Sequence, residues 1–384
     1  MSIAPNSSVP SKQDDQKIKV MIVDDSIVIR GLIGRWLQAL PDMEIVARCR
    51  NGQDAVDTIA RVKADVVVLD IEMPIMDGLT ALPKILAAAP GTKVLMASTL
   101  TRRNAGISIK ALTLGAVDYV PKPESTRDGH ASTEFQNELI DKIRAIGTKK
   151  PAKAAPKRMF AAERTSASEV RGGLLDKKKP ELILQKASTV KPQILAVGSS
   201  TGGPKALFDF FGAVTSSLDD VPIVITQHMP PTFTAILAEH LANSTQRTCV
   251  EGADGMKLEP GVIYVAPGGK HMIMKKVGLN TVIVLDDGEP VNFCKPAVDP
   301  MLDSLLPIYG AAMLVCILTG MGHDGRDGSI KVQEKGGTVV AQDEDSSVVW
   351  GMPGAVAQAG ICHKILPLSD LPGEVAKLLK GARV

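Results

Sequence analysis

The turn at residues 198–203 has the residue types to do chemistry. Its sequence is Gly-Ser-Ser-Thr-Gly-Gly, between a short apolar run and a helical pattern that begins near Pro204. Backbone N–H groups of such a turn can bind a phosphate. Alternatively, Gly198, Ser200 and Gly202 match G-x-S-x-G, the pattern of a nucleophilic serine between a strand and a helix. A third possibility is that the hydroxyl groups only cap the helix.

A serine nucleophile needs a base, and the base usually needs an acid that orients it. His228 ends the apolar run PIVITQH, at the sheet edge where we expect Ser200. Asp324 and Asp327 follow another buried run, in ILTGMGHDGRDG. His323 is a rival base, but neighbouring side chains usually point apart, so we rank it below His228. The pattern predicts a relay of Ser200, His228 and one of the two acids, Asp324 or Asp327.

A second group of chemical residues lies in the first half of the chain. Asp24 and Asp25 follow the first apolar run, and Asp70 ends the third. Ser98 ends the fourth run and Lys122 follows the fifth. Strand ends of a parallel sheet meet at one crevice, where three carboxylates require a cation, and oxygen ligands suit Mg²⁺. Asp70 could then accept a phosphoryl group whose charge Lys122 and the metal neutralise.

The elements that must position the first-half residues alternate regularly. Apolar runs predict strands at 18–25, 44–49, 65–70, 93–98 and 117–123, and helical patterns cover 27–40, 53–62, 78–89, 104–115 and 132–146. Strands this apolar are buried on both faces. We therefore expect a doubly wound, five-stranded parallel sheet of the flavodoxin-like kind, with helices on each side.

The same alternation resumes in the second half. Strands are expected at 193–197, 222–228, 261–267, 312–320 and 337–343, helices at 204–216, 231–243, 299–309 and 326–335, and a hairpin at 271–287. The hairpin follows from two strand-like arms around Val-Gly-Leu-Asn. The pattern predicts a second doubly wound α/β domain, mostly parallel, with an antiparallel hairpin.

Composition divides the chain into two folded parts. Its 384 residues suffice for two domains, and 45% hydrophobic with 22% charged residues is a globular composition. Residues 147–191 are rich in Lys, Ala and Pro and have the character of a largely solvated linker. The expected division is a disordered N-terminus at 1–17, a first domain at 18–146, the linker at 147–191 and a catalytic domain at 192–384.

Charge and cysteine content exclude several classes of protein. The net charge of +2 gives no general attraction to nucleic acid or to an anionic membrane. The five cysteines contain no CxxC pair, which favours a reduced compartment without a disulfide framework. No run is long enough to span a membrane, and the first residues lack an apolar signal region. We expect a cytoplasmic monomer with no direct membrane insertion.

The first-half motifs occur together in a known family. VDDS, LDIEMPIMDGL, MAST and VPKP, in this order, resemble the receiver domain of two-component response regulators, over about residues 18–140. The resemblance implies that Asp70 is the phosphoacceptor. It also implies a Mg²⁺ site formed by Asp25, Asp70 and the Glu72 carbonyl, to which Asp24 contributes through water. Ser98 and Lys122 would be the phosphate-sensing pair.

The second-half motifs carry another resemblance. GSSTGGP, TQHMPP, VAPGGKHM, LTGMGHDG and VWGMPGA resemble the catalytic domain of the CheB family, over about residues 192–380. This family comprises the protein-glutamate methylesterases and protein-glutamine deamidases of chemotaxis. The resemblance implies that Ser200 is the nucleophile, His228 the base and Asp324 the acid that orients it. The backbone of Met321 or Gly322 would donate to the oxyanion. Two departures are Ser199, where relatives often have alanine, and a longer linker.

Together the two resemblances imply a phosphorylation-activated serine hydrolase. It would demethylate glutamate methyl esters, releasing methanol, and deamidate glutamines on methyl-accepting chemoreceptors. Its phosphodonor would be a histidine kinase of the CheA type, with Mg²⁺ needed for phosphorylation and no cofactor for hydrolysis. Two alternatives stay open: a phosphorylation-controlled anion- or nucleotide-binding module that uses residues 198–203, and a DNA-binding regulator. The second half lacks the basic face and short three-helix reader of the latter.

Overall fold

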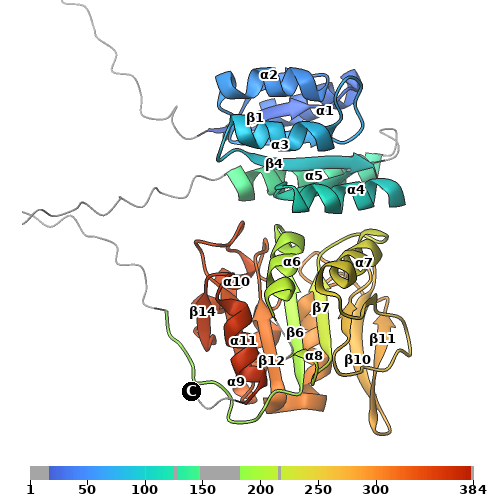
Figure 1. Cartoon of the computed structure of the whole chain (residues 1–384), viewed down its shortest axis with the longest axis vertical. Helices are drawn as coiled ribbons and strands as arrows, with labels where there is room; N and C mark the ends of the chain where they lie inside the picture. The colour runs from blue at the N-terminus through green and yellow to red at the C-terminus, as the bar shows by residue number, and fades with distance from the viewer. Residues whose placement is uncertain (1–16, 100, 124–128, 148–181, 215–217, 382–384) are drawn as a thin grey trace, which may run out of the picture.

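The computed structural model describes most of the chain in two α/β units (Figure 1). The described residues are 17–99, 101–123, 129–147, 182–214 and 218–381. The expected disordered N-terminus, apart from its last residue, and most of the expected linker lie outside them.

The N-terminal unit is a parallel sheet with strand order β2-β1-β3-β4-β5. The strands are β1 Ile18–Val23, β2 Met43–Cys49, β3 Val66–Asp70, β4 Lys93–Thr99 and β5 Asp118–Lys122, and the helices are α1 Ile27–Gln38, α2 Gly52–Val62, α3 Gly78–Ala88, α4 Arg102–Thr113 and α5 Gly129–Gly147. The central strand β3 is buried along its whole length, as its continuous apolar sequence predicts. The expected flavodoxin-like fold class is confirmed.

Polar side chains begin the first four helices of this unit. The oxygens of Ser26, Asn51, Asp77 and Thr101 each accept a hydrogen bond from a backbone N–H of the first helical turn. Such caps satisfy donors that the helix itself cannot pair. Three of these helices, α1, α2 and α4, begin within four residues of a strand end, and α3 begins eight residues after β3.

The C-terminal unit is built around a seven-stranded parallel sheet with strand order β14-β13-β12-β6-β7-β9-β8, and β10 and β11 form a separate antiparallel pair. The strands are β6 Ile194–Ser199, β7 Ile223–Gln227, β8 Cys249–Glu251, β9 Ile263–Val265, β10 His271–Val277, β11 Asn280–Asp286, β12 Met313–Ile317, β13 Thr338–Gln342 and β14 Lys364–Leu366. The helices are α6 Gly203–Ala213, α7 Phe233–Thr245, α8 Val298–Tyr309, the 3-10 helix η3 Gly310–Ala312, α9 Arg326–Glu334, α10 Met352–Gln358 and α11 Leu371–Leu379. The predicted parallel sheet with an antiparallel hairpin is confirmed. Sequence reasoning missed β8 and β14, which are three residues long each and too short to show a period.

The two units pack against each other through apolar side chains. Helix α4 of the first unit lies against α6 and α7 of the second (Figure 1). The ring of Tyr119, in β5, stacks on that of Phe233, in α7, with centroids 4.4 Å apart and an interplanar angle of 3°. One apolar cluster therefore runs from the first core into the second.

Residues 182–191 differ from the solvated linker that we expected there. The Gln185 N–H donates to the Cys362 carbonyl at 2.8 Å, and the Ser188 N–H donates to the Thr338 hydroxyl at 2.9 Å. Leu182 packs against the core of the C-terminal unit. These backbone and apolar contacts make the segment part of that unit, and the only sign of this in the sequence is the short apolar run at 182–184.

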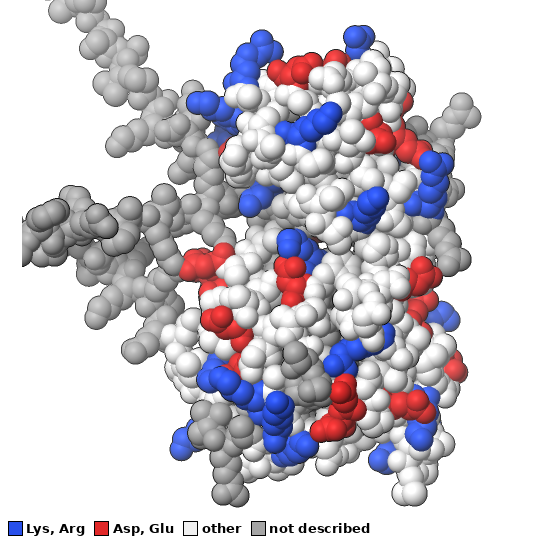
Figure 2. Space-filling model, viewed as in Figure 1, with Lys and Arg blue, Asp and Glu red and all other residues white. Residues whose placement is uncertain are grey.

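The surface carries charges of both signs. On the face that Figure 2 shows, lysines and arginines are interspersed with acidic residues. Among the helices in the described ranges, none is long and apolar enough to cross a membrane.

Candidate catalytic and phosphoacceptor sites

Strands β6 and β7 bring the predicted nucleophile and base to one sheet edge. Ser199 and Gln227 are in register, so Ser200 and His228 leave the sheet side by side. The Gln227 amide fastens the two chains, because its Nε2 donates to the carbonyls of Ser200 and His228, at 3.0 and 3.2 Å. Its Oε1 accepts from the Ser199 hydroxyl at 2.7 Å. The departure at Ser199 is thus a buried support for the turn, and the role of Gln227 was missed.

The turn that carries Ser200 is shaped by glycines. Gly202 starts α6 with φ of 75°, a left-handed conformation that favours glycine, and no side-chain hydrogen bond caps the helix there. The helix-capping alternative therefore has no support among the described residues. Across the turn, a Cβ added to Gly320 would lie 2.9 Å from the Cβ of Ser200. Only glycine at 320 lets the loop after β12 approach the serine this closely.

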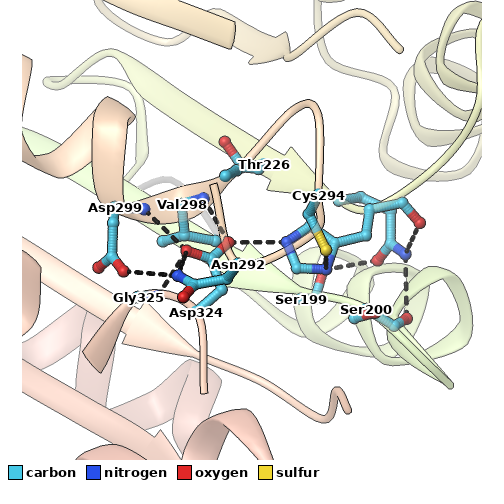
Figure 3. Close-up of polar contacts among 12 residues, drawn as sticks. Ser199, Ser200, Thr226, Asn292, Cys294, Val298, Asp299, Asp324 and Gly325 are labelled. Atoms are coloured by element: carbon cyan, nitrogen blue, oxygen red, sulfur yellow. Dashed lines mark hydrogen bonds and ion pairs between the residues drawn. The ribbon is translucent and has the colours of Figure 1, made fainter. Parts of the chain in front are cut away.

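Asp324 lies deep in the site and contacts the imidazole of His228. Its Oδ2 is 2.7 Å from His228 Nε2, and the residue is 1% exposed. Four further groups donate to the carboxylate (Figure 3): the N–H groups of Val298, Asp299 and Gly325, and Asn292 Nδ2. Burial raises the pKa of Asp324, but the hydrogen bonds from His228 and the backbone outweigh it and hold the pKa below its usual range. Two of these donors belong to the first turn of α8, whose N-terminus favours an anion.

Both ring nitrogens of His228 are engaged. Cys294 Sγ lies 3.3 Å from Nδ1, opposite the contact of Nε2 with Asp324. Burial lowers the pKa of His228, but the hydrogen bonds with Asp324 and Cys294 more than compensate and raise it to about 9. No hydrogen bond joins the Ser200 hydroxyl to the ring in the part of the chain that the structure describes. Sequence reasoning missed Cys294, because a single cysteine in a loop gives no pattern.

Asn292 connects the carboxylate of Asp324 to that of Asp299. Asn292 Nδ2 donates to Asp299 Oδ2 at 3.0 Å and to Asp324 Oδ1 at 3.2 Å. Burial raises the pKa of Asp299 to about 6, the charge of Asp324 adds to this, and the Gly328 N–H opposes it. Neither residue was singled out from the sequence, since both precede or begin a helix in a stretch without a recognised motif.

The expected oxyanion donors lie in the loop after β12. The N–H groups of Met321 and Gly322 make no hydrogen bond to any described residue, so they are free to donate to a substrate oxygen. They follow Gly320, which contacts Ser200. The other candidates for the base and the acid lie away from the site. His323, the rival base, is exposed, and Asp327, the second acid of this loop, is exposed and pairs with Arg326.

The carboxylates of the N-terminal unit gather where β1 and β3 end. Ligand oxygens of Asp24, Asp25 and Asp70 all lie within 4.8 Å of one another. Lys122 Nζ contacts Asp24 Oδ2 at 2.8 Å and Asp70 Oδ1 at 2.7 Å. Burial raises the pKa of Asp70 to about 6, Lys122 opposes this, and the charge of Asp24 adds to it. One ammonium cannot balance three carboxylates, so the oxygen donors present fit a divalent cation such as Mg²⁺.

Ser98 and Glu72 flank this cluster. Ser98 is 1% exposed, and its hydroxyl donates to the Thr99 carbonyl at 3.2 Å. It follows Ala97, which is paired with Asp70 in the register of β3 and β4. Glu72 is exposed and lines, with Asp25 and six other residues, a pocket of about 440 Å³. The pocket gives a phosphodonor an open approach to the cluster.

Family comparisons match both units. The family described as CheB methylesterase matches residues 195–375. The family described as response regulator receiver domain matches residues 20–134.

Similar proteins cover the whole chain. A protein-glutamate methylesterase/protein-glutamine glutaminase of Rhodopseudomonas palustris (strain BisB5) is 49% identical over 383 residues, which are 100% of this chain and 99% of that protein. A protein of the same name from Nitrobacter hamburgensis is 51% identical over 95% of each chain. The crystal structure of the Thermotoga maritima CheB methylesterase catalytic domain is 39% identical, with a TM-score of 0.47, covering 49% of this chain and 100% of that one.

Proposed function

This chain belongs to the CheB methylesterase family and carries a response regulator receiver domain, and from this premise we propose how its residues perform and control the reaction. The protein is a protein-glutamate methylesterase and protein-glutamine glutaminase. The observation that carries the site proposal is the 2.7 Å contact of His228 with Asp324 at the sheet edge where Ser200 leaves β6.

In the proposed reaction, Ser200 is the nucleophile. Its oxygen attacks the side-chain carbonyl carbon of a γ-glutamyl methyl ester, and His228 accepts the hydroxyl proton. The accepting atom is Nδ1, because Asp324 engages Nε2. The N–H groups of Met321 and Gly322 donate to the oxyanion, and losing one such donor typically costs about 3 kcal/mol.

The intermediate collapses when methanol leaves with the proton that His228 returns. Water then attacks the acyl-enzyme and His228 accepts its proton. The bond to the Ser200 oxygen breaks, His228 returns the proton to that oxygen, and glutamate is released. A glutamine side chain follows the same course, with ammonia as the leaving group. Asp324 keeps the imidazole oriented throughout and stabilises its charged form.

Cys294 occupies the ring nitrogen of His228 that has to accept the serine proton. With a pKa of about 9, His228 is mostly protonated at neutral pH, and its Nδ1 faces the thiol. Proton transfer from Ser200 requires that Nδ1 be unprotonated and that the thiol yield its place to the serine hydroxyl. The arrangement described above is therefore a resting arrangement of the base.

The receiver unit accepts the activating phosphoryl group at Asp70. Asp24, Asp25, Asp70 and the Glu72 carbonyl would hold Mg²⁺, which neutralises charge on the transferring group when it is bound. Lys122 already contacts Asp70 and pairs with the added charge, and Ser98 supplies a hydroxyl for a phosphoryl oxygen. The phosphodonor is a histidine kinase, which we propose to be of the CheA type.

Control of hydrolysis follows from where the receiver packs. Val348 packs against the receiver core, and a Cβ added to Gly202, in the nucleophile turn, would lie 2.7 Å from the Cβ of Val348. Helix α4 and the Tyr119–Phe233 stack lie at the same boundary. We infer that the unphosphorylated receiver restricts access to Ser200 and that phosphorylation at Asp70 weakens this packing.

The substrates are chemoreceptor proteins, which we propose to be of the methyl-accepting class. We also propose that the protein is a monomer that acts in the cytoplasm. All five cysteines are free in the structure, which agrees with a reducing compartment.

Methanol release from a methylated chemoreceptor tests the site. We expect Ser200→Ala to abolish release while Asp70 still becomes phosphorylated, because the two sites share no side chain. A fluorophosphonate probe should label the wild type and not Ser200→Ala. Substantial turnover by the variant would refute the assignment of the nucleophile.

A further inference from the structure

A tight turn beside the active site exposes a large aromatic side chain. Val291 and Cys294 exchange two backbone hydrogen bonds, of 3.1 and 2.9 Å, so Asn292 and Phe293 are the two corners of a two-residue turn. Both corners have positive φ, 52° and 63°. Such corners favour Asn and Gly, and a bulky residue at the second corner is a rare, strained choice. The side chain of Phe293 is 101% exposed.

The turn is fixed on both sides of Phe293 by residues of the proposed catalytic machinery. On one side, Asn292 Nδ2 donates to Asp299 and Asp324. On the other side, Cys294 Sγ contacts the base, His228, at 3.3 Å. Figure 3 shows Asn292 turned toward Asp324. The backbone that carries Phe293 is therefore held beside the site, and no described residue packs on its ring.

Packing inside this chain does not explain the exposed ring. The receiver unit is docked in the structure and leaves Phe293 fully exposed, so the receiver is not its partner. Strained backbone and exposed aromatic surface each cost stability, and such costs are concentrated at functional sites. An exposed aromatic side chain on a turn whose two neighbouring residues contact Asp324 and His228 fits a partner that enters the site itself.

We infer that Phe293 is a specificity-determining residue that contacts an apolar side chain of the protein substrate next to the modified glutamyl group. This inference rests on the proposed function, since it names what that site recognises around the ester. Burying an exposed ring against an apolar neighbour stabilises the complex, and aromatic residues are common anchors of protein contacts. The protein-sized substrate thus gains affinity that an isolated ester cannot gain.

Two substrates separate recognition from chemistry. One is the purified cytoplasmic part of a methylated chemoreceptor, and the other is a short peptide whose γ-methyl glutamyl ester is flanked by alanines. Methanol release gives kcat/KM for each with the full-length protein. For Phe293→Ala we expect the ratio of receptor to peptide kcat/KM to fall about tenfold, mostly through KM for the receptor. A purely structural role would lower both values together and leave the ratio unchanged.

Two further variants control the experiment. Phe293→Gly removes the ring and relieves the positive φ, so we expect it to lose receptor preference as Phe293→Ala does while unfolding at a higher temperature. Leu279→Ala removes another exposed apolar side chain, 96% exposed at the tip of the β10–β11 hairpin, and should leave the ratio as in the wild type. Equal ratios for wild type and both Phe293 variants would overturn the inference.

Binding distinguishes failure of the inference from failure of the proposed function. In a Ser200→Ala background, which cannot turn over, Phe293→Ala should weaken binding of the methylated receptor fragment about tenfold. Wild type that hydrolyses neither substrate would refute the function alone, and unchanged binding would refute the role of Phe293 alone. If Phe293→Gly instead changed the oligomeric state in sedimentation, the ring would contact a second copy of the chain and the inference would be wrong.

Discussion

Replacing Cys294 by alanine should move the pH dependence of hydrolysis toward acid. In the resting arrangement, the thiol lies 3.3 Å from His228 Nδ1 and helps to hold the pKa of the imidazole at about 9. Alanine removes this contact and leaves that of Asp324 with Nε2 in place. The base then loses its proton at lower pH, so a larger fraction of the enzyme is ready to accept the serine proton.

The size of the effect follows from the titration of one group. With a pKa of about 9, only about 1% of His228 is neutral at pH 7. The wild-type rate should therefore rise about tenfold per pH unit between pH 6 and 8 and level off near pH 9. Each unit by which Cys294→Ala lowers the pKa should raise the rate at pH 7 about tenfold. Asp299, whose pKa is about 6, titrates at the acid end of this range, so the slope is read between pH 7 and 8.

The assay is methanol release from a γ-methyl glutamyl peptide between pH 6 and 10, with the release by Ser200→Ala subtracted as background. Cys294→Ser is the matched control, because its hydroxyl keeps a hydrogen-bonding group at Nδ1 and should shift the profile less. Superimposable acid limbs for wild type and Cys294→Ala would show that the thiol does not set the protonation of the base. An acid limb with an apparent pKa near 6.5 in the wild type would refute the whole electrostatic argument.

Four further outcomes are expected. The folded-state pKa of His228 is raised from its ordinary value near 6.5, so the stability that the protonated imidazole contributes is complete below pH 6.5 and is lost as the pH rises through about 9. Chemical denaturation should show a loss of roughly 3 kcal/mol in the free energy of unfolding over this pH range. Asp324→Ala should lower kcat by about 10⁴-fold in steady-state methanol release, as expected when the base loses its orienting acid, and a loss below tenfold would contradict that role. Tyr119→Ala removes the stack on Phe233, worth about 1 kcal/mol beyond area burial, so hydrolysis without phosphodonor should rise about fivefold; unchanged basal hydrolysis would argue against occlusion by the receiver. Asp70→Asn should keep basal hydrolysis and lose its stimulation by a phosphodonor, and a stimulated rate equal to that of the wild type would place the acceptor elsewhere.

Local patterns account for the parts of the molecule that were predicted. The strand runs are continuous and apolar because both sheet faces are covered, so β3 and β6 could be found without knowing their neighbours. In parallel sheets, residues at strand ends share one edge. This rule placed Asp24, Asp70 and Lys122 together before any distance was known, and the same rule set Ser200 beside His228.

Other features depend on contacts that no local pattern encodes. Cys294 meets His228 across 66 residues of sequence, and Gln185 meets Cys362 across 177. Such contacts arise from how loops and units pack. Periodicity reports only whether a residue faces a core, so it is silent about loop residues such as Asn292.

The residue types and their order along the chain determined the fold class, and they predicted two sets of candidate site residues and the sheet edge where each set lies. Packing in three dimensions settled the state of those residues: which nitrogen of His228 faces the acid, what occupies the other nitrogen, and how the receiver lies against the nucleophile turn. The difference arises because strands and helices follow from short-range hydrophobic and hydrogen-bonding preferences. Protonation and access, in contrast, depend on burial and charges contributed by distant segments.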